Sequence, residues 1–172
     1  MIRRFRSLGR TMAKTKSAFP AEGGCTCRAV RYRLRTKPMF VHCCHCTWCQ
    51  RETGSAFALN AMIETERVKI LTGAPDVVQT PSNSGKGQKI VRCPICHVAL
   101  WSHYPGGVLK VAFVRVGTLD APNLCPPDIH IFTSTKQKWV ELGDRVPVRK
   151  AYDERQRLWP ADCLKRYEAL MR

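Results

Sequence analysis

The stretch Cys44-His45-Cys46-Thr47-Trp48-Cys49 places three cysteines within six residues. Its CxC motif overlaps a CxxC motif, and a short loop of this kind can bring several thiolates to one zinc ion, at about 2.3 Å each. Three ligands leave the fourth corner of the tetrahedron to be explained. In a structural site a distant residue closes that corner, whereas in a catalytic site it stays open for chemistry.

Two further cysteine pairs help to decide between these alternatives. Cys25 and Cys27 form a CxC motif, and Cys93 and Cys96 form a CxxC motif. Two such hooks from separate strands are the usual ligands of a closed four-cysteine zinc site. Pairing them leaves the tripod, defined as Cys44, Cys46 and Cys49, without a fourth partner.

The competing arrangement gives the tripod a fourth ligand from a histidine. The chain offers five candidates, which are His42, His45, His97, His103 and His130. His45 lies between two of the proposed ligands, so its side chain is expected to point away from the metal. We favour the open tripod.

The remaining cysteines are not assigned to a metal. Adjacent side chains diverge along an extended chain, so Cys43 is interpreted as a buried small residue or a neighbour behind the ligands. Cys125 and Cys163 have no partner in the sequence and are interpreted as ordinary thiols.

The composition indicates one basic intracellular domain. A chain of 172 residues suits a single domain with its own core. The sequence shows no signal peptide and no stretch of transmembrane length, so its ten cysteines favour zinc over disulfides and a cytoplasmic protein without a membrane partner. The net charge of +16 favours an anionic partner, which could be nucleic acid, acidic lipid or a small carboxylated substrate.

Residues 1–18 are predicted to form a disordered basic arm, followed by a zinc domain over 19–150 and a helical extension over 151–172. The arm carries six basic residues and no acidic one. It could be a nucleic-acid tail, a mitochondrial presequence or an upstream extension of a protein whose translation starts at Met12 rather than Met1. We favour the last alternative, and nucleic acid is expected to bind only through this arm.

The hydrophobic pattern predicts a mainly β fold. Val30, Tyr32 and Leu34 alternate with arginines, as in a half-buried strand. A helical turn is expected over 50–55, broken at Gly54, and an amphipathic helix from Pro160, interpreted as packing on the domain for stability alone. Further strands are expected over 57–63, 68–71, 77–80 and 109–116, with a terminal strand pair over 129–133 and 138–142.

Taken together, the motifs resemble the glutathione-dependent formaldehyde-activating (GFA) family, also called the CENP-V/GFA domain. The resemblance covers about residues 20–150 and rests on several short motifs. These are Gly24-Cys25-Thr26-Cys27, Cys44-His45-Cys46-x-x-Cys49 with Thr53-Gly54-Ser55, Cys93-Pro94-x-Cys96, His130-Ile131-Phe132, and Trp139 to Pro147. Two positions depart from the family pattern, since Arg28 and His97 stand where members carry glycine after a hook.

The resemblance implies a zinc-stabilised β-tent fold with two Zn²⁺ per chain. Cys25, Cys27, Cys93 and Cys96 would hold a structural zinc, and Cys44, Cys46 and Cys49 a catalytic zinc. The reaction it implies is the reversible joining of glutathione and formaldehyde to S-hydroxymethylglutathione, catalysed by a carbon–sulfur lyase.

The expected mechanism places the substrate thiol at the open position of the tripod zinc. Arg51 is a candidate clamp for a substrate carboxylate, and His45 and His130 are candidate general bases. A related thiol–aldehyde adduct is an alternative substrate. Two alternative functions are a glutathione- or thiol-binding carrier without turnover, and a basic zinc interaction module, for which the sequence offers no recognition helix.

Overall fold

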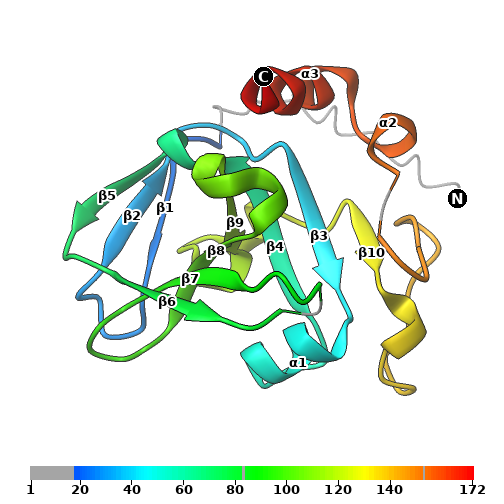
Figure 1. The fold of residues 1–172 in the computed structure, drawn as a ribbon, viewed down its shortest axis with the longest axis horizontal. Coiled ribbons are helices and arrows are strands. Elements are labelled where there is room, and N and C mark those ends of the chain that lie inside the picture. Colours follow the sequence, from blue (N-terminus) through cyan, green and yellow to red (C-terminus); the bar gives the residue numbers. More distant parts are fainter. Residues whose placement is uncertain (1–17, 83, 153) are drawn as a thin grey trace, which may run out of the picture.

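A computed structural model describes residues 18–82, 84–152 and 154–172 and shows a mainly β protein with a C-terminal helix (Figure 1). The smaller sheet has the strand order β1-β2-β5, and the larger has the order β10-β3-β4-β9-β8-β7-β6. The strands are β1 (Ala21–Gly24), β2 (Arg31–Leu34), β3 (Phe40–Cys44), β4 (Ala58–Glu64), β5 (Val68–Thr72), β6 (Asp76–Thr80), β7 (Gln88–Arg92), β8 (Ala99–His103), β9 (Val111–Arg115) and β10 (Ile129–Ile131). The predicted mainly β fold with a C-terminal helix is confirmed.

Within the described residues, three α-helices accompany the sheets. They are α1 (Thr47–Thr53), α2 (Arg155–Leu158) and α3 (Ala161–Met171), and short 3-10 helices lie at Thr65–Arg67, Pro105–Lys110, Val116–Thr118, Pro122–Leu124 and Thr133–Thr135. Gly54 ends α1 in the left-handed conformation that glycine adopts without strain, as the sequence predicted. No helix in the described part of the chain is long and apolar enough to cross a membrane.

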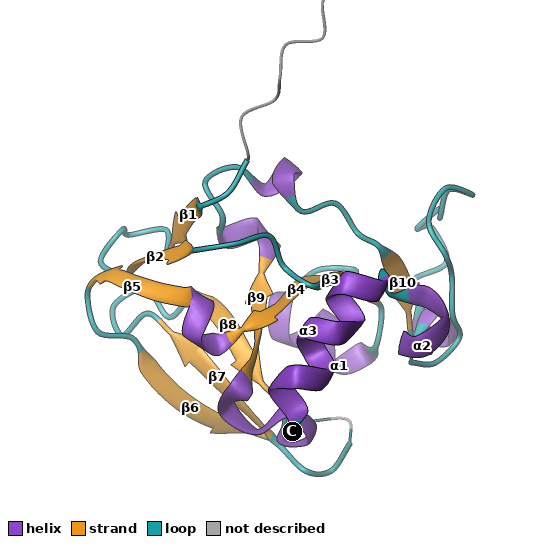
Figure 2. Ribbon diagram, turned by 90° about the horizontal axis from the view of Figure 1, so that it is seen from above, coloured by secondary structure: helices purple, strands orange, loops and turns teal. Residues whose placement is uncertain are grey.

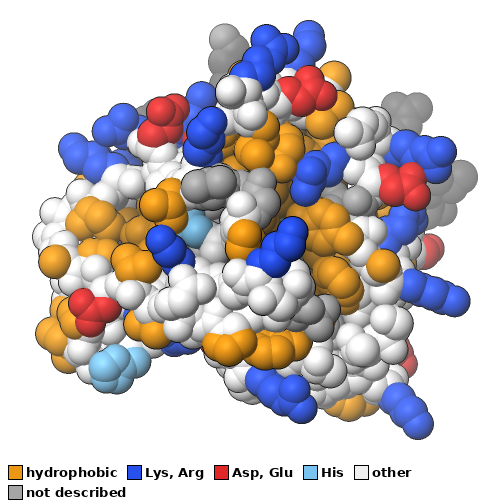
Figure 3. All heavy atoms as spheres, in the orientation of Figure 1, with side chains coloured by type: hydrophobic (Ala, Val, Ile, Leu, Met, Phe, Trp, Pro, Cys, Tyr) orange, Lys and Arg blue, Asp and Glu red, His pale blue; other side chains and the backbone are white. Residues whose placement is uncertain are grey.

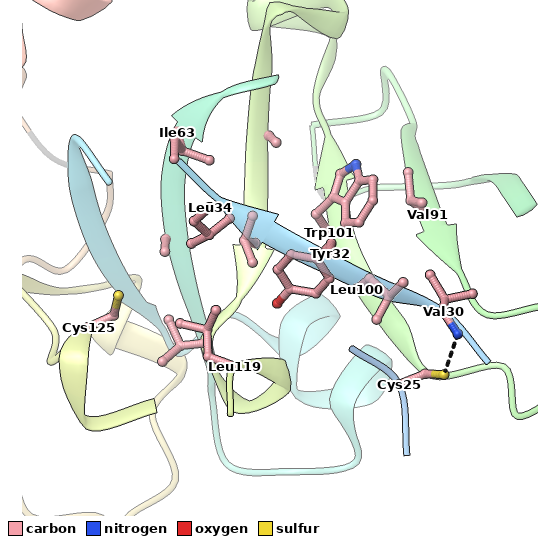
Figure 4. Packing of buried hydrophobic residues seen from close by; sticks show 14 of the residues in the cluster. Cys25, Val30, Tyr32, Leu34, Ile63, Val91, Leu100, Trp101, Leu119 and Cys125 are labelled. Atoms are coloured by element: carbon pink, nitrogen blue, oxygen red, sulfur yellow. Dashed lines mark hydrogen bonds between the residues drawn. The ribbon is translucent and has the colours of Figure 1, made fainter. Parts of the chain in front are cut away.

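One hydrophobic core lies between the two sheets. Tyr32 and Leu34 of β2 are fully buried because the alternation of apolar and arginine residues sends them to one face. The ring of Tyr32 meets that of Trp101 from β8 edge-on, with centroids 5.7 Å apart (Figure 4). Strand β9 corresponds to the strand predicted over 109–116. It lies between β4 and β8 and is therefore central in the large sheet.

A second core lies on the other side of the large sheet, beneath the C-terminal segment (Figure 2). Trp159, just before α3, stacks on Phe40 of β3 at 4.9 Å, and Leu164 and Tyr167 of α3 pack against the same cluster. The tripod cysteines belong to this cluster. The large sheet therefore separates the tripod from the core shared with the small sheet.

One predicted strand pair is wrong. Residues 138–142 form no strand, and β10 pairs in parallel with β3 instead. The ammonium of Lys136 donates to the carbonyl of Val140 at 2.6 Å and to that of Gln137, so this segment is held as a loop by a side chain rather than by a ladder. Trp139, at 73% exposure, projects from that loop.

Four of the described strands were not predicted from the sequence, namely β1, β3, β7 and β8. The basic-arm prediction and the choice between Met1 and Met12 fall outside the described residues, apart from Ala18. The division at residues 18 and 150 stays a prediction.

Candidate metal centre

The tripod is formed where β3 passes into α1. Cys44 is the last residue of β3, Cys46 is the N-cap of α1, and Cys49 lies in its first turns. Their sulfur atoms all lie within 4.8 Å of one another, and all three side chains are buried. The Sγ of Cys46 accepts a hydrogen bond from the backbone N–H of Cys49 at 3.4 Å, which fixes the sulfur at the start of the helix.

The electrostatics of the tripod fit a cation. Contacts with the thiols of Cys44 and Cys49, and the backbone N–H groups of Cys49 and Trp48, lower the pKa of Cys46 to about 2. The contacts with Cys46 and Cys49, together with burial, raise the pKa of Cys44. One ionised sulfur thus opposes ionisation of its neighbours, and a divalent cation would allow all three to be thiolates.

The two cysteine hooks meet in a separate cluster. Cys25 and Cys27 come from the β1–β2 turn, and Cys93 and Cys96 follow β7; their four sulfurs lie within 4.8 Å of one another. The Sγ of Cys27 lies 3.5 Å from the Sγ of Cys25 and 3.6 Å from the Sγ of Cys93. Tetrahedral zinc with bonds of about 2.3 Å separates its sulfurs by about 3.8 Å, so this donor set fits a zinc ion.

Both hooks turn through a left-handed residue. Arg28 has φ 63° and His97 has φ 58°, in the region that favours glycine. Each residue donates its backbone N–H to the carbonyl of the first cysteine in its hook, Arg28 to Cys25 and His97 to Cys93, both at 3.0 Å. Arg28 and His97 therefore adopt a backbone conformation that glycine favours, although each carries a Cβ.

A cavity of about 690 Å³ adjoins the tripod, and all three of its cysteines line the wall. Much of the remaining wall is apolar, with Met62, Val111, Phe113, Ile131 and Phe132. In Figure 3 apolar side chains gather below the C-terminal helix, with Lys and Arg side chains around them. A second cavity, of about 830 Å³, carries Cys96 of the hook cluster on its wall.

The C-terminal segment closes part of the cavity beside the tripod. Tyr152, Arg155 and Tyr167 line it, and the Arg155 guanidinium lies 4.6 Å over the ring of Tyr167. Cation–π contact of this kind fixes the position of the charge. The segment was interpreted as serving stability alone, but it also supplies part of the cavity wall.

Sequence reasoning missed several polar residues of the wall, among them Tyr104 and Arg115. The Arg115 guanidinium is buried and donates to the Oδ1 of Asn60 and, at 3.0 Å, to the Oγ of Ser102. Burial raises the pKa of Tyr104, and the charge of nearby Cys49 adds to this, so its hydroxyl stays a donor. Arg115 could have been noticed as a lone charge at the end of an apolar strand, whereas nothing in the sequence singles out Tyr104.

Three other residues named from the sequence lie elsewhere. Arg51 is exposed on α1 and is not among the described residues that line the cavity. His45 and His130 lie together, with 3.0 Å between His45 Nε2 and His130 Nδ1, and are likewise absent from the described lining. Burial lowers the pKa of both, that of His45 to about 4.

Fold and site together define a cysteine-rich β protein with two thiol clusters among the described residues, and all three cysteines of one cluster, the tripod, line a cavity. The family described as "Glutathione-dependent formaldehyde-activating enzyme" (GFA) matches residues 20–135, and the chain belongs to this family. No curated protein matches the chain significantly. The crystal structure of a Rhodobacter sphaeroides protein, a structural genomics target, is 18% identical, with a TM-score of 0.44, and covers 74% of this chain and 98% of its own.

Proposed function

We propose that the protein is a zinc-dependent carbon–sulfur lyase that acts on the glutathione–formaldehyde adduct or a related thiol–aldehyde adduct. The observation that carries this proposal is that the three tripod sulfurs line a cavity large enough for a small peptide thiol. Membership of the GFA family supports the same class of reaction.

We further propose that the two thiol clusters each hold one zinc ion, which makes two zinc ions per chain at these clusters. Cys25, Cys27, Cys93 and Cys96 would hold one of them and join β1–β2 to β7–β8, which makes this site the structural staple of a β-tent fold. Cys44, Cys46 and Cys49 would hold the other. Bound in the tripod, zinc would supply a Lewis acid that keeps a substrate sulfur in the thiolate form at neutral pH.

The charges of the cavity suit glutathione, which carries two carboxylates and one ammonium. Lys86 and Arg155 both line the cavity and would hold the carboxylates. Glu52 also lines it, but its carboxylate is paired with Arg92 and does not oppose an anionic ligand. In this arrangement Lys86 and Arg155 take the role that the sequence assigned to Arg51.

The chemical step needs a donor near the sulfur. The thiolate gives an electron pair to the carbonyl carbon of formaldehyde, so the C–S bond forms while the π pair moves to oxygen. Tyr104 would donate a hydrogen bond to that developing alkoxide, which then takes a proton from solvent water, the acceptor of the proton that the thiol gave up, to become the hydroxymethyl group. In the reverse direction the hydroxyl loses its proton and the C–S bond breaks.

The proposal is tested by NMR exchange spectroscopy on formaldehyde, glutathione and their adduct, with and without the protein. We expect the wild-type protein to accelerate exchange, Cys46→Ser to abolish the acceleration, and Cys163→Ser to retain it. No acceleration at high concentrations of zinc-loaded protein would contradict lyase activity on this substrate. Retention of glutathione without acceleration would indicate the carrier function instead.

A further inference from the structure

We infer that Cys43, His45 and His130 form a third metal site, which binds zinc on the face of β3 opposite the tripod. This inference does not depend on the proposed lyase activity. The ligand atoms of the three residues all lie within 4.8 Å of one another, as in the two thiol clusters.

The site follows from the alternation of side chains along an extended strand. Phe40, His42 and Cys44 of β3 face the second core and the tripod cavity, so Val41 and Cys43 face the other way. His45 follows Cys43 by two residues and returns to the same side. Two pairs of possible ligands with the same spacing therefore overlap in the sequence, Cys44/Cys46 on one side and Cys43/His45 on the other.

The parallel pairing of β10 with β3 adds the third ligand. His130 is the register partner of Cys43, and Ile131 is the partner of Cys44. Because Ile129 and Ile131 face the second core, His130 between them must face away from it, beside Cys43. The backbone N–H of His45 donates to the carbonyl of Ile131 at 3.0 Å, which holds the two segments in this register.

The separations of the donor atoms match a tetrahedral zinc ion. Zinc bonds of about 2.3 Å to sulfur and about 2.0–2.1 Å to nitrogen place sulfur and nitrogen about 3.5 Å apart and two nitrogens about 3.3 Å apart. The Sγ of Cys43 lies 3.5 Å from the Nε2 of His45, and that atom lies 3.0 Å from the Nδ1 of His130. An adjustment of a few tenths of an ångström between the imidazoles completes the fit.

The site is also rigid before any metal binds. The backbone carbonyl of His45 accepts hydrogen bonds from Gln50 Nε2 at 2.7 Å and from Thr135 Oγ1 at 3.0 Å. The ring of Phe57 packs on the His45 ring, with centroids 5.4 Å apart. A preformed set of one thiol and two imidazoles selects a borderline-soft divalent cation, and zinc is the one this donor set suits.

Access distinguishes this site from the tripod. Cys43 and His45 are buried, while His130 is half-buried and forms the rim. With three protein ligands and a rim that reaches solvent, the ion is expected to exchange more readily than one held by four thiolates. The third site should therefore fill when the protein is dialysed against buffered free zinc in excess.

The decisive measurement is the zinc content of the dialysed full-length protein, with the fold checked by near-ultraviolet circular dichroism. We expect three zinc ions per chain in the wild type, two in Cys43→Ser and in His130→Gln, and three in Cys125→Ser, which removes a buried thiol outside the clusters. A zinc content in both site variants equal to that of the wild type would overturn the inference, whatever number of ions the two thiol clusters hold.

A measurement on the wild type removes the dependence on how the variants fold. In long-range ¹H–¹⁵N spectra, the Nε2 of His45 and the Nδ1 of His130 should shift together as zinc fills the third equivalent. If neither nitrogen shifts while zinc binds elsewhere, the two histidines form only a hydrogen-bonded pair and the inference fails.

Discussion

Arg166 of α3 forms a bidentate ion pair with Glu64 of β4. Its Nε donates to Oε1 at 2.9 Å and its Nη2 donates to Oε2 at 2.6 Å. The Glu64 side chain is only 5% exposed, so its charge depends on this partner. Tyr167, the next residue of α3, lines the cavity beside the tripod. The Arg166–Glu64 pair therefore helps to hold α3 on the sheet, and with it the part of the cavity wall that α3 supplies.

Replacing Arg166 by methionine should destabilise the protein by about 2–3 kcal/mol, because a buried carboxylate loses its main partner. Urea denaturation measures the loss. Arg157→Met is the matched control, since its pair with Glu154 is exposed and should contribute less than about 0.5 kcal/mol. Equal effects of the two substitutions would contradict a special role for Arg166.

The same pair predicts how stability depends on pH. Burial alone would raise the pKa of Glu64, but the hydrogen bonds from Arg166 outweigh it and lower the pKa below its usual value. The stabilisation is therefore complete above the unfolded-state pKa of about 4.3 and is lost as the pH falls through the lower folded-state value. The difference in unfolding free energy between wild type and Glu64→Gln should shrink below about pH 4; a difference that stays constant would contradict this assignment.

The left-handed turns of the two hooks predict stabilising substitutions. Arg28→Gly and His97→Gly should each raise the free energy of unfolding by about 1 kcal/mol, because a Cβ is unfavourable at their positive φ. Thermal denaturation of the zinc-loaded protein checks this. Ala29→Gly, at a neighbouring residue without positive φ, should be neutral or destabilising, and stabilisation by all three would show that the left-handed turn is not the cause.

The sequence predicted those parts of the site whose residues lie close together in the chain, and missed those that the fold brings together from distant segments. The cysteine motifs are chelating loops of a few residues, so their spacing alone indicated the two groups whose sulfurs the structure brings together. Tyr104, Arg115 and Arg155 instead reach the cavity from the residue after β8, from the end of β9 and from α2. Their meeting depends on the strand order and on the docking of the C-terminal segment, which no local pattern contains.

The fold shows the same limit. Alternation predicted β2 because Tyr32 and Leu34 are buried on one face while the arginines that alternate with them are only partly buried. The sequence singled out His130 but not its position beside Cys43. That position depends on the parallel pairing of β10 with β3, in which the paired residues lie 87 positions apart in the chain. The false strand over 138–142 had a strand-like composition, yet the backbone carbonyl of Val140 within it accepts a hydrogen bond from the Lys136 side chain.

Removing one ligand from each thiol cluster should have opposite effects on folding. Cys46→Ser should lose one zinc ion while the fold survives, because the tripod lies between elements that also pack through the second core. Cys96→Ser should unfold the protein, since a structural zinc supplies folding free energy. Metal analysis and circular dichroism measure both, and unfolding by both substitutions would contradict the open-site assignment.

The cavity predicts a substrate dependence at Arg155. If its guanidinium holds a carboxylate of glutathione, Arg155→Gln should raise KM about tenfold with little change in kcat, because the contact is made equally in the ground and transition states. Arg157→Gln on the same helix is the control, since Arg157 is 80% exposed. Cysteamine, a thiol without carboxylates, should react equally well with both variants and the wild type. A loss of kcat with both thiols would instead mean that Arg155 acts on the reacting atoms or on the position of α3.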